Sequence, residues 1–250
     1  MKKNLLLSSA VLALTVLGST TTVFAADDAT YKTQGTITFT PGDDVTPPTN
    51  PIDPGNPIQP IDPVQPTGGP LSIDYASNFK FGTQKIETVD KTYFAALDQF
   101  KDATTGDTSE TVNFVQVTDK RGSLAGWNLT TRQMDQFHTA DGDVLTGAQL
   151  AIKTASVVSG TGDASNDAYQ PGTVASTVTY TPDKAAQPGL IAEKGKGAGT
   201  WIYRFGDTKD AGSTAVALTV PGKTTKLAKL YTTNLEWTLA DTPGNPTVTE

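Results

Sequence analysis

Alternation of apolar and polar residues is the main pattern of this chain, and it is clearest near the C-terminus. Leu235, Trp237 and Leu239 occupy every second position, with polar residues between them. This spacing is typical of a half-buried strand, and the breaker run at residues 241–244 ends it. A second Trp-x-Leu triplet stands far upstream at residues 127–129. The two triplets predict two strands of similar character.

The rest of residues 71–250 repeats the alternation in short pieces. Glycine next to aspartate, threonine or arginine marks the turns between them, as at residues 105–107, 121–123 and 141–143. Many short strands between such turns predict an all-β domain that is sandwich-like or barrel-like. The predicted strands are 71–75, 79–82, 111–118, 126–130, 149–154, 174–180, 200–205, 215–220 and 226–239, and only 93–100 and 145–151 show a short helical pattern.

The N-terminus has the pattern of a targeting segment. Lys2 and Lys3 precede an apolar run, and the small residue Ala25 closes the sequence Val-Phe-Ala. This predicts a signal peptide at residues 1–25, removed after Ala25, and therefore a secreted protein. An uncleaved anchor helix is the alternative, but the apolar run is shorter than the ~20 residues that a membrane span needs. We expect no membrane insertion.

The segment that follows divides into a short strand and a spacer. Within residues 26–40, positions 36–40 alternate and predict a short strand. Residues 41–70 hold ten of the 16 prolines, several aspartates and no basic residue. This composition predicts an open, extended acidic linker in polyproline-II geometry. The linker would act as a stalk across a polymer layer, with a ligand for proline-binding domains as an alternative.

Composition removes several classes of function. The net charge is −7, from 26 acidic and 19 basic residues, so nothing favours nucleic acid or an anionic membrane surface as partner. The absence of cysteine excludes disulfides and thiolate sites, and stability must come from a core. The end of the chain, Pro-Thr-Val-Thr-Glu, has neither an apolar tail nor a basic sorting signal. We therefore expect non-covalent retention at the cell surface.

A search for catalytic residues yields weak candidates. His138 is the single histidine, and no Gly-x-Ser-x-Gly elbow accompanies it. The glycine-rich residues 195–199 lack the ending of a phosphate loop, and residues 141–143 form at most one arm of a calcium site. The carboxylates that would suit a wall glycosidase stand out only by being acidic: Asp98, Asp102, Asp135, Asp141 and Asp143. The sequence therefore predicts a protein that is not an enzyme and holds no metal or cofactor.

The three tryptophans, Trp127, Trp201 and Trp237, each fall on a predicted strand. Trp201, Tyr203 and Phe205 would share one face of theirs. An aromatic residue on a strand is more often part of a core than a ligand platform. Tryptophan faces also stack on sugar rings, so both interpretations stay open.

These motifs together resemble the small WxL-domain surface proteins of low-GC Gram-positive bacteria. The resemblance runs from the short strand at 35–40 and the Pro-Ile-Asp-Pro spacer through residues 69–82, 115–122, 126–129 and 220–222. Its most specific piece is Tyr-x-x-x-Leu-x-Trp-x-Leu with a following proline, which is matched by Tyr231, Leu235, Trp237, Leu239 and Pro243. The residue before the tryptophan, often threonine in the family, is Glu236 here, and alternation should turn it away from Trp237.

The resemblance implies attachment to the cell wall, with peptidoglycan as ligand. It also implies partners, namely larger WxL proteins and membrane-anchored WxL-interacting proteins, and connects the family with adhesion to host extracellular matrix. The candidate binding residues are Trp127, Asn128, Leu129, Tyr231, Leu235, Trp237, Thr238 and Leu239. Two alternatives remain for them: contacts on a binding surface, or the core of a structural subunit that recruits another surface protein.

Overall fold

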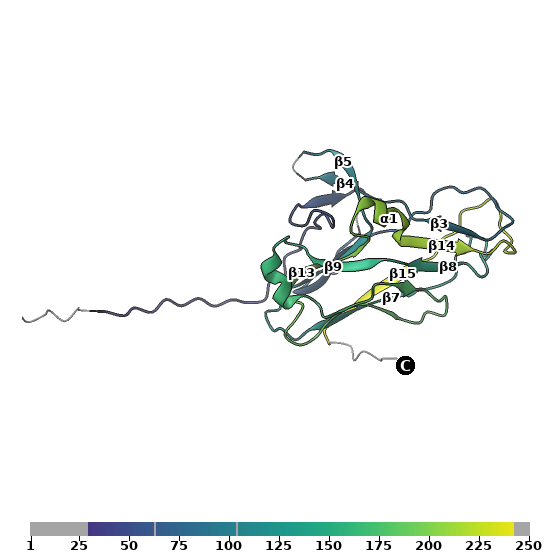
Figure 1. The fold of residues 1–250 in the computed structure, drawn as a ribbon. Helices are drawn as coiled ribbons and strands as arrows, with labels where there is room; N and C mark the ends of the chain where they lie inside the picture. Colours follow the sequence, from purple (N-terminus) through teal and green to yellow (C-terminus); the bar gives the residue numbers. More distant parts are fainter. Residues whose placement is uncertain (1–29, 63, 104, 243–250) are drawn as a thin grey trace, which may run out of the picture. The chain divides into compact units, whose positions relative to one another are not determined.

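The computed structural model describes residues 30–62, 64–103 and 105–242. The chain divides into residues 1–38 and residues 39–250, and every described strand and helix belongs to the second unit. Four antiparallel sheets make up this unit, which confirms the all-β prediction (Figure 1). The predicted signal peptide, 1–25, lies outside the described residues. No helix in the described part of the chain is long and apolar enough to cross a membrane.

Two four-stranded sheets contribute facing sides to one core. The first has the order β10 (Thr173–Val174), β12 (Gln187–Ala192), β7 (Trp127–Gln133), β15 (Leu235–Ala240). The second has the order β2 (Leu71–Ala76), β6 (Phe114–Asp119), β13 (Gly199–Phe205), β9 (Ala155–Ser159).

Two further sheets complete the unit. One adds apolar residues to the same core and has the order β11 (Val178–Thr179), β8 (Gln149–Ile152), β14 (Val216–Val220), β3 (Lys91–Phe94). The other is three-stranded, with the order β1 (Ile58–Pro60), β4 (Asp98–Asp102), β5 (Thr108–Thr111). The helices are η1 (Ala164–Tyr169) and α1 (Lys209–Ala215).

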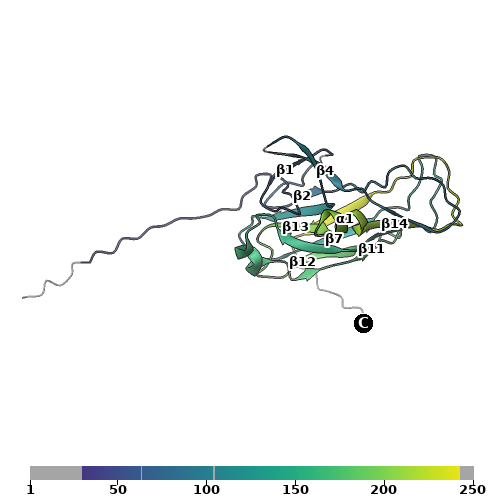
Figure 2. The ribbon, with the colours of Figure 1, turned by 45° about the horizontal axis from the view of Figure 1, so that its top comes forward.

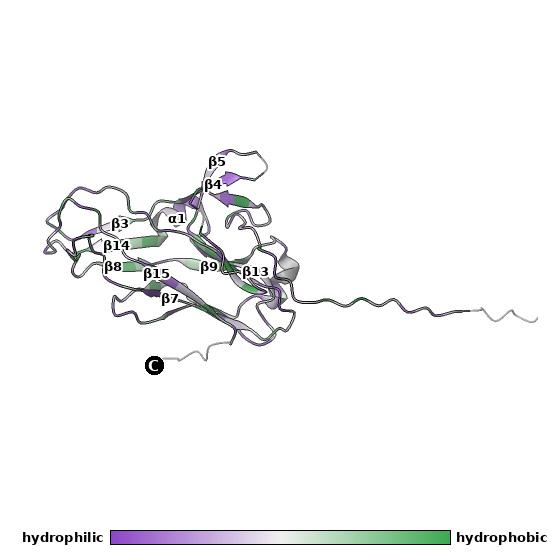
Figure 3. Ribbon diagram, turned by 180° about the vertical axis from the view of Figure 1, so that it is seen from behind, coloured by the Kyte–Doolittle hydropathy of each residue, from purple (hydrophilic) through white to green (hydrophobic). Residues whose placement is uncertain are grey.

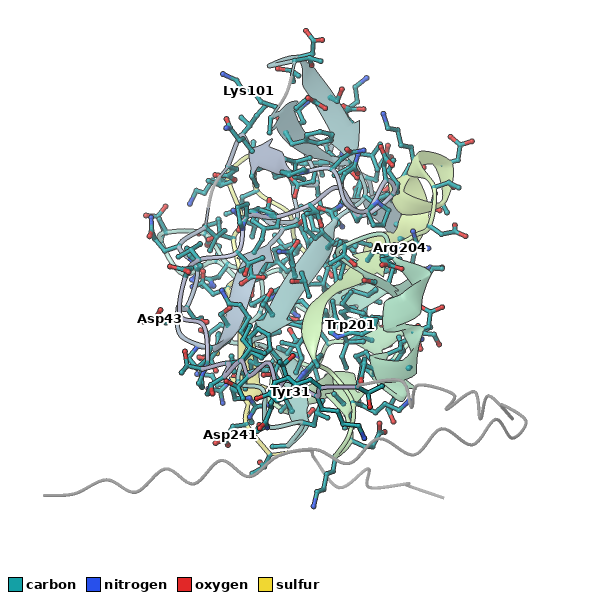
Figure 4. The ribbon with its side chains drawn as sticks, turned by 90° about the vertical axis from the view of Figure 1, so that its left-hand side faces the viewer. Tyr31, Asp43, Lys101, Trp201, Arg204 and Asp241 are labelled. Atoms are coloured by element: carbon teal, nitrogen blue, oxygen red, sulfur yellow. The ribbon has the colours of Figure 1, made fainter. Side chains whose placement is uncertain are left out.

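Strand β13 shows how the sequence pattern builds the core. Trp201, Tyr203 and Phe205 share one face of the strand, as predicted, and this face points into the main core, while Ile202 points to the opposite side. Figure 3 shows the apolar colour along β13, β9 and β14, and Figure 4 shows Trp201 among packed side chains. Both faces of β13 are covered, and its middle residues, Trp201 to Tyr203, are therefore apolar without alternation.

The cover on the far side of β13 and β6 comes from the proline-rich segment, which corrects the prediction of an open linker at 41–70. Ile58 is buried in a second cluster with Phe100, Phe114 and Ile202, and β1 pairs with β4 (Figure 2). Every residue of β6 is consequently buried. Part of the expected stalk is therefore a layer of the domain.

Proline can serve in this layer because it lacks an N–H that would need a partner, while its carbonyl still accepts. Gln116 donates to the carbonyl of Pro47, Arg204 donates to that of Pro51, and the Ile58 N–H donates to that of Pro48. Composition alone hides this, because the acceptors are backbone atoms and two of the three donors, Gln116 and Arg204, lie far away in sequence.

A carboxylate is buried beneath the same layer. Asp74 accepts hydrogen bonds from Thr118 at 2.6 Å, Ser72 at 2.7 Å and Gln116 at 3.0 Å. Burial raises the pKa of Asp74, and these three donors oppose the rise. The polar cluster thus fixes the register between β2, β6 and the proline-rich residues above them.

Other local predictions are wrong in instructive ways. Residues 36–40 form no strand, although they alternate, because no described strand pairs with them. Residues 93–100 and 145–151 are not helical and contribute instead to β3, β4 and β8. Residues 79–82 lie outside the strands, and only the last part of 226–239 is extended as β15. Helix α1 was not predicted, although Thr208 caps it by accepting from the Ala211 N–H.

Candidate functional site

The two Trp-x-Leu triplets, 110 residues apart in the chain, lie on neighbouring antiparallel strands. β7 pairs with β15 so that Leu129 lies opposite Leu239 and Thr131 opposite Trp237. Side chains alternate along each strand, so the leucines and tryptophans of both triplets point to the core side. The structure therefore joins the two motifs into one element of the fold.

Trp127 is the fully buried tryptophan of the two triplets. Its side chain is 0% exposed, and its indole N–H donates to the carbonyl of Gly197 at 3.0 Å. Gly197 has a φ of 82°, and a Cβ there would collide with that indole. Trp201 uses the same turn, donating to Ala198 at 3.0 Å. The glycine-rich residues 195–199 thus accept from two buried tryptophans.

Trp237, by contrast, is half-buried. Its ring lies 6.3 Å from that of Phe205 at an interplanar angle of 17°, and 6.3 Å from that of Tyr203 at 77°. Leu235 and Leu239 are also only partly covered by the core. Leu129, opposite Leu239, is fully buried. These apolar residues stabilise the sheet from its core side.

The outer face of the pair is polar. Asn128, Thr130 and Arg132 alternate with the buried residues of β7, and Glu236 and Thr238 alternate with the partly buried core-side residues of β15. Thr130 lies opposite Thr238. Arg132 binds Glu236, with 2.6 Å between Nη2 and Oε1, so Glu236 does turn away from Trp237 as predicted. We call these five residues the outer face.

Asn128 carries an unusual atom. Its side-chain oxygen Oδ1 is buried and has no hydrogen-bond partner among the described residues. A buried unpaired acceptor is costly unless a donor reaches it. The two threonine hydroxyls give the outer face hydrogen-bonding capacity toward hydroxyl-rich or amide-rich ligands, whereas the Asn128 oxygen itself is covered. Of the predicted binding residues, only Asn128 and Thr238 belong to this face.

Tyr231, the remaining predicted residue, lies apart from it. The Tyr231 side chain is half-buried against the core, and its hydroxyl accepts from the Leu227 N–H at 3.0 Å. The adjacent Thr232 bridges to His138 through backbone hydrogen bonds. Tyr231 therefore orders the loop that leads into β15.

Arg121 is a structural residue of the site that the sequence did not single out. Its guanidinium contacts Asp119 at 2.8 Å, donates to the Gly126 carbonyl at 2.7 Å and reaches the Asp241 carbonyl at 3.5 Å. The hydrogen bonds to Asp119 raise the pKa of Arg121. One side chain thus connects the ends of β6, β7 and β15. A charged Asp-Lys-Arg-Gly turn after a buried strand was the available signal.

The catalytic candidates are dispersed. Asp98 accepts from Tyr75 and Ser77, both at 2.6 Å. Asp141 and Asp143 both bind the ammonium of Lys229, at 2.9 and 2.8 Å, and that contact lowers the pKa of Asp143. A lysine therefore holds the position that a calcium ion would take between these carboxylates. Within the described ranges, no group of three or more metal-ligating side chains comes together.

A family model described as WxL domain, surface cell wall-binding, matches residues 26–243. The match covers most of the chain, so the protein belongs to the WxL-domain family of surface cell-wall-binding domains. No curated protein and no solved structure matches the chain.

Proposed function

We propose that this protein is secreted and attaches non-covalently to peptidoglycan, without catalysing a reaction. Cell-wall binding is the property of the family to which the chain belongs. The observation that supports a specific site is the pairing of the two signature strands, which gathers their polar side chains on one outer face. Export would be accompanied by removal of residues 1–25, and the mass of the exported protein would test this cleavage.

The outer face is a better candidate than the tryptophans themselves. Trp127 is fully buried, and Trp237 faces the core side. The outer face offers two hydroxyls and an ion pair, and the unpaired oxygen of Asn128 is buried. Sugar hydroxyls and stem-peptide amides both donate and accept hydrogen bonds, so they match this set.

A pelleting assay tests the proposal. The purified mature protein is mixed with isolated Gram-positive walls, and with the same walls after chemical removal of their secondary polymers. Substitution of Asn128, Thr130 and Thr238 by alanine should weaken binding by roughly tenfold or more, because each lost hydrogen bond contributes ~0.5–1.5 kcal/mol. Thr179→Ala, at an exposed strand position of β11, is the matched control.

Two outcomes would contradict the proposal. Binding that disappears with the secondary polymers would exclude peptidoglycan as ligand. Unchanged pelleting of the folded triple variant would exclude the outer face as site. Thermal melting of each variant shows whether the fold is intact.

A second candidate is a structural subunit that binds another surface protein, such as a membrane-anchored WxL-interacting partner or a larger WxL protein. The burial of Trp127 and Leu129 favours it, since in this case the signature residues are core residues. Adhesion to host matrix is compatible with either candidate. Wall binding by the isolated, folded protein with no partner present would count against the second candidate.

A further inference from the structure

Strand β15 is the last strand of its sheet, and no described strand pairs with its free edge. Among the described strands it pairs with β7 alone, and β2 of the facing sheet approaches over a short stretch without pairing. The Met134 N–H donates to the Asn234 carbonyl just before β15 begins. Hydrogen-bonded and non-hydrogen-bonded pairs alternate in an antiparallel ladder. The N–H and C=O groups of Leu235, Trp237 and Leu239 therefore point away from β7.

No hydrogen bond within the described part of the chain reaches these groups from the open side. The strand also lacks the usual protection of an edge: it is six residues long, without proline or lysine, and its one charged residue, Glu236, is engaged by Arg132. Its core-side residues are only partly covered. An edge with these properties is suited to accept another strand.

The edge of the facing sheet is protected. On β2, the Ile73 carbonyl accepts from the Thr67 N–H at 3.0 Å, and the Ile73 N–H donates to the Thr67 hydroxyl at 2.9 Å. Within the described residues, the chain thus covers the edge at β2 with its own proline-rich segment and leaves the edge at β15 open.

The same chain carries a strand-forming segment that pairs with no described strand. Ile37 and Phe39 are 78% and 84% exposed, and Thr36, Thr38 and Thr40 alternate with them. β-branched and aromatic residues favour strands, and the segment from 35 to 40 has no charge. Exposed alternation of this kind is unexpected in a stable monomer unless the apolar face is covered elsewhere.

We propose that residues 35–40 of a second copy add to the free edge of β15. In this pairing Ile37 and Phe39 would extend the core side next to Trp237, and the threonines would extend the outer face. Thr38 would then stand beside Thr238, and neighbouring threonines are favourable across strands. Donor and acceptor are different surfaces, so the contact is heterologous and repeats from copy to copy into a linear assembly. The proposal does not depend on wall binding.

Sedimentation of the mature full-length chain over a concentration series tests the assembly. The double variant Ile37→Asp/Phe39→Asp should remain monomeric where the wild type associates, because charge cannot enter the apolar side of the new strand. Both side chains are exposed, so the fold should survive. Tyr31→Asp is the control, since Tyr31 is 92% exposed and lies outside the donor residues. A wild type that is monomeric throughout, or association that the double variant retains, would overturn the proposal.

Engineered cysteines identify the partner, because the chain has no cysteine of its own. A mixture of Thr38→Cys and Thr238→Cys chains should form a disulfide between copies under mild oxidation. A Tyr31→Cys chain replaces Thr38→Cys in the control mixture and should not cross-link. A chain carrying both Thr38→Cys and Thr238→Cys that only closes on itself would overturn the second copy as occupant, as would an absence of any specific cross-link.

Discussion

β7 and β15 carry the same triplet in opposite situations. β7 lies inside its sheet, and its Trp127 and Leu129 are fully buried. β15 lies at the edge, and its Trp237 and Leu239 are only half-buried. The local pattern is the same, so the difference comes from the neighbouring strands alone. A Trp-x-Leu triplet therefore identifies the core-side face of a strand. The position of the strand in its sheet then determines whether that face is fully or only partly buried.

The largest effect should come from Trp127→Ala. It leaves a cavity in the core and the Gly197 carbonyl without its donor. Truncation of a buried tryptophan costs ~3–5 kcal/mol, which is a large part of the stability of a domain. Chemical denaturation should show this loss or a failure to fold. Near-wild-type stability would mean that β7 is not the more critical of the two strands.

Gly197→Ala should have the second-largest effect, because the added Cβ would collide with the Trp127 indole. The left-handed backbone costs ~1–2 kcal/mol for a residue with a Cβ, and the collision with Trp127 adds ~1–3 kcal/mol of overpacking. Gly195→Ala is the matched control, with φ of 89° but open space around the added Cβ. Equal losses of unfolding free energy in the two variants would show that contact with Trp127 does not matter.

The sequence predicted the faces of these strands and not their places in the sheet. Alternation is local, so it oriented Trp201, Trp237 and Glu236 correctly. Whether a strand is central or at an edge depends on pairings between distant segments, such as β12 with β7. Alternation at 36–40 likewise predicted a strand that the described monomer lacks, because a strand needs a partner.

The prediction for the proline-rich segment was wrong for a related reason. Its composition predicts an open chain, and hydrogen bonding to Gln116 and Arg204 overrides that tendency. Of the residues predicted for the candidate site, Asn128 and Thr238 lie on the outer face, and the others lie on the core side. The sequence could not identify Arg121 or Thr130, since their importance depends on which strand ends and cross-strand neighbours meet.

Trp237→Ala should be milder than either change around Trp127. The ring is half-exposed and packs on Phe205 and Tyr203, so its removal should cost ~1–2 kcal/mol of unfolding free energy. Trp237→Phe should recover part of that loss by restoring a ring against Phe205. A loss as large as that of Trp127→Ala would remove the distinction between central and edge strand. The measurement is denaturant unfolding of both alanine variants under the same conditions.

The smallest effect should come from the ion pair that joins the two strands on their outer face. The side chains of Arg132 and Glu236 are 39% and 42% exposed, so a double-mutant cycle with alanine should give a coupling of ~0.2–1 kcal/mol that decreases as salt is added. The core-side residues of β7 and β15 would then carry the stability of the pair, and the outer face would be free to serve binding. A coupling of several kcal/mol, insensitive to salt, would instead make the outer face a structural element and weaken its case as a ligand site.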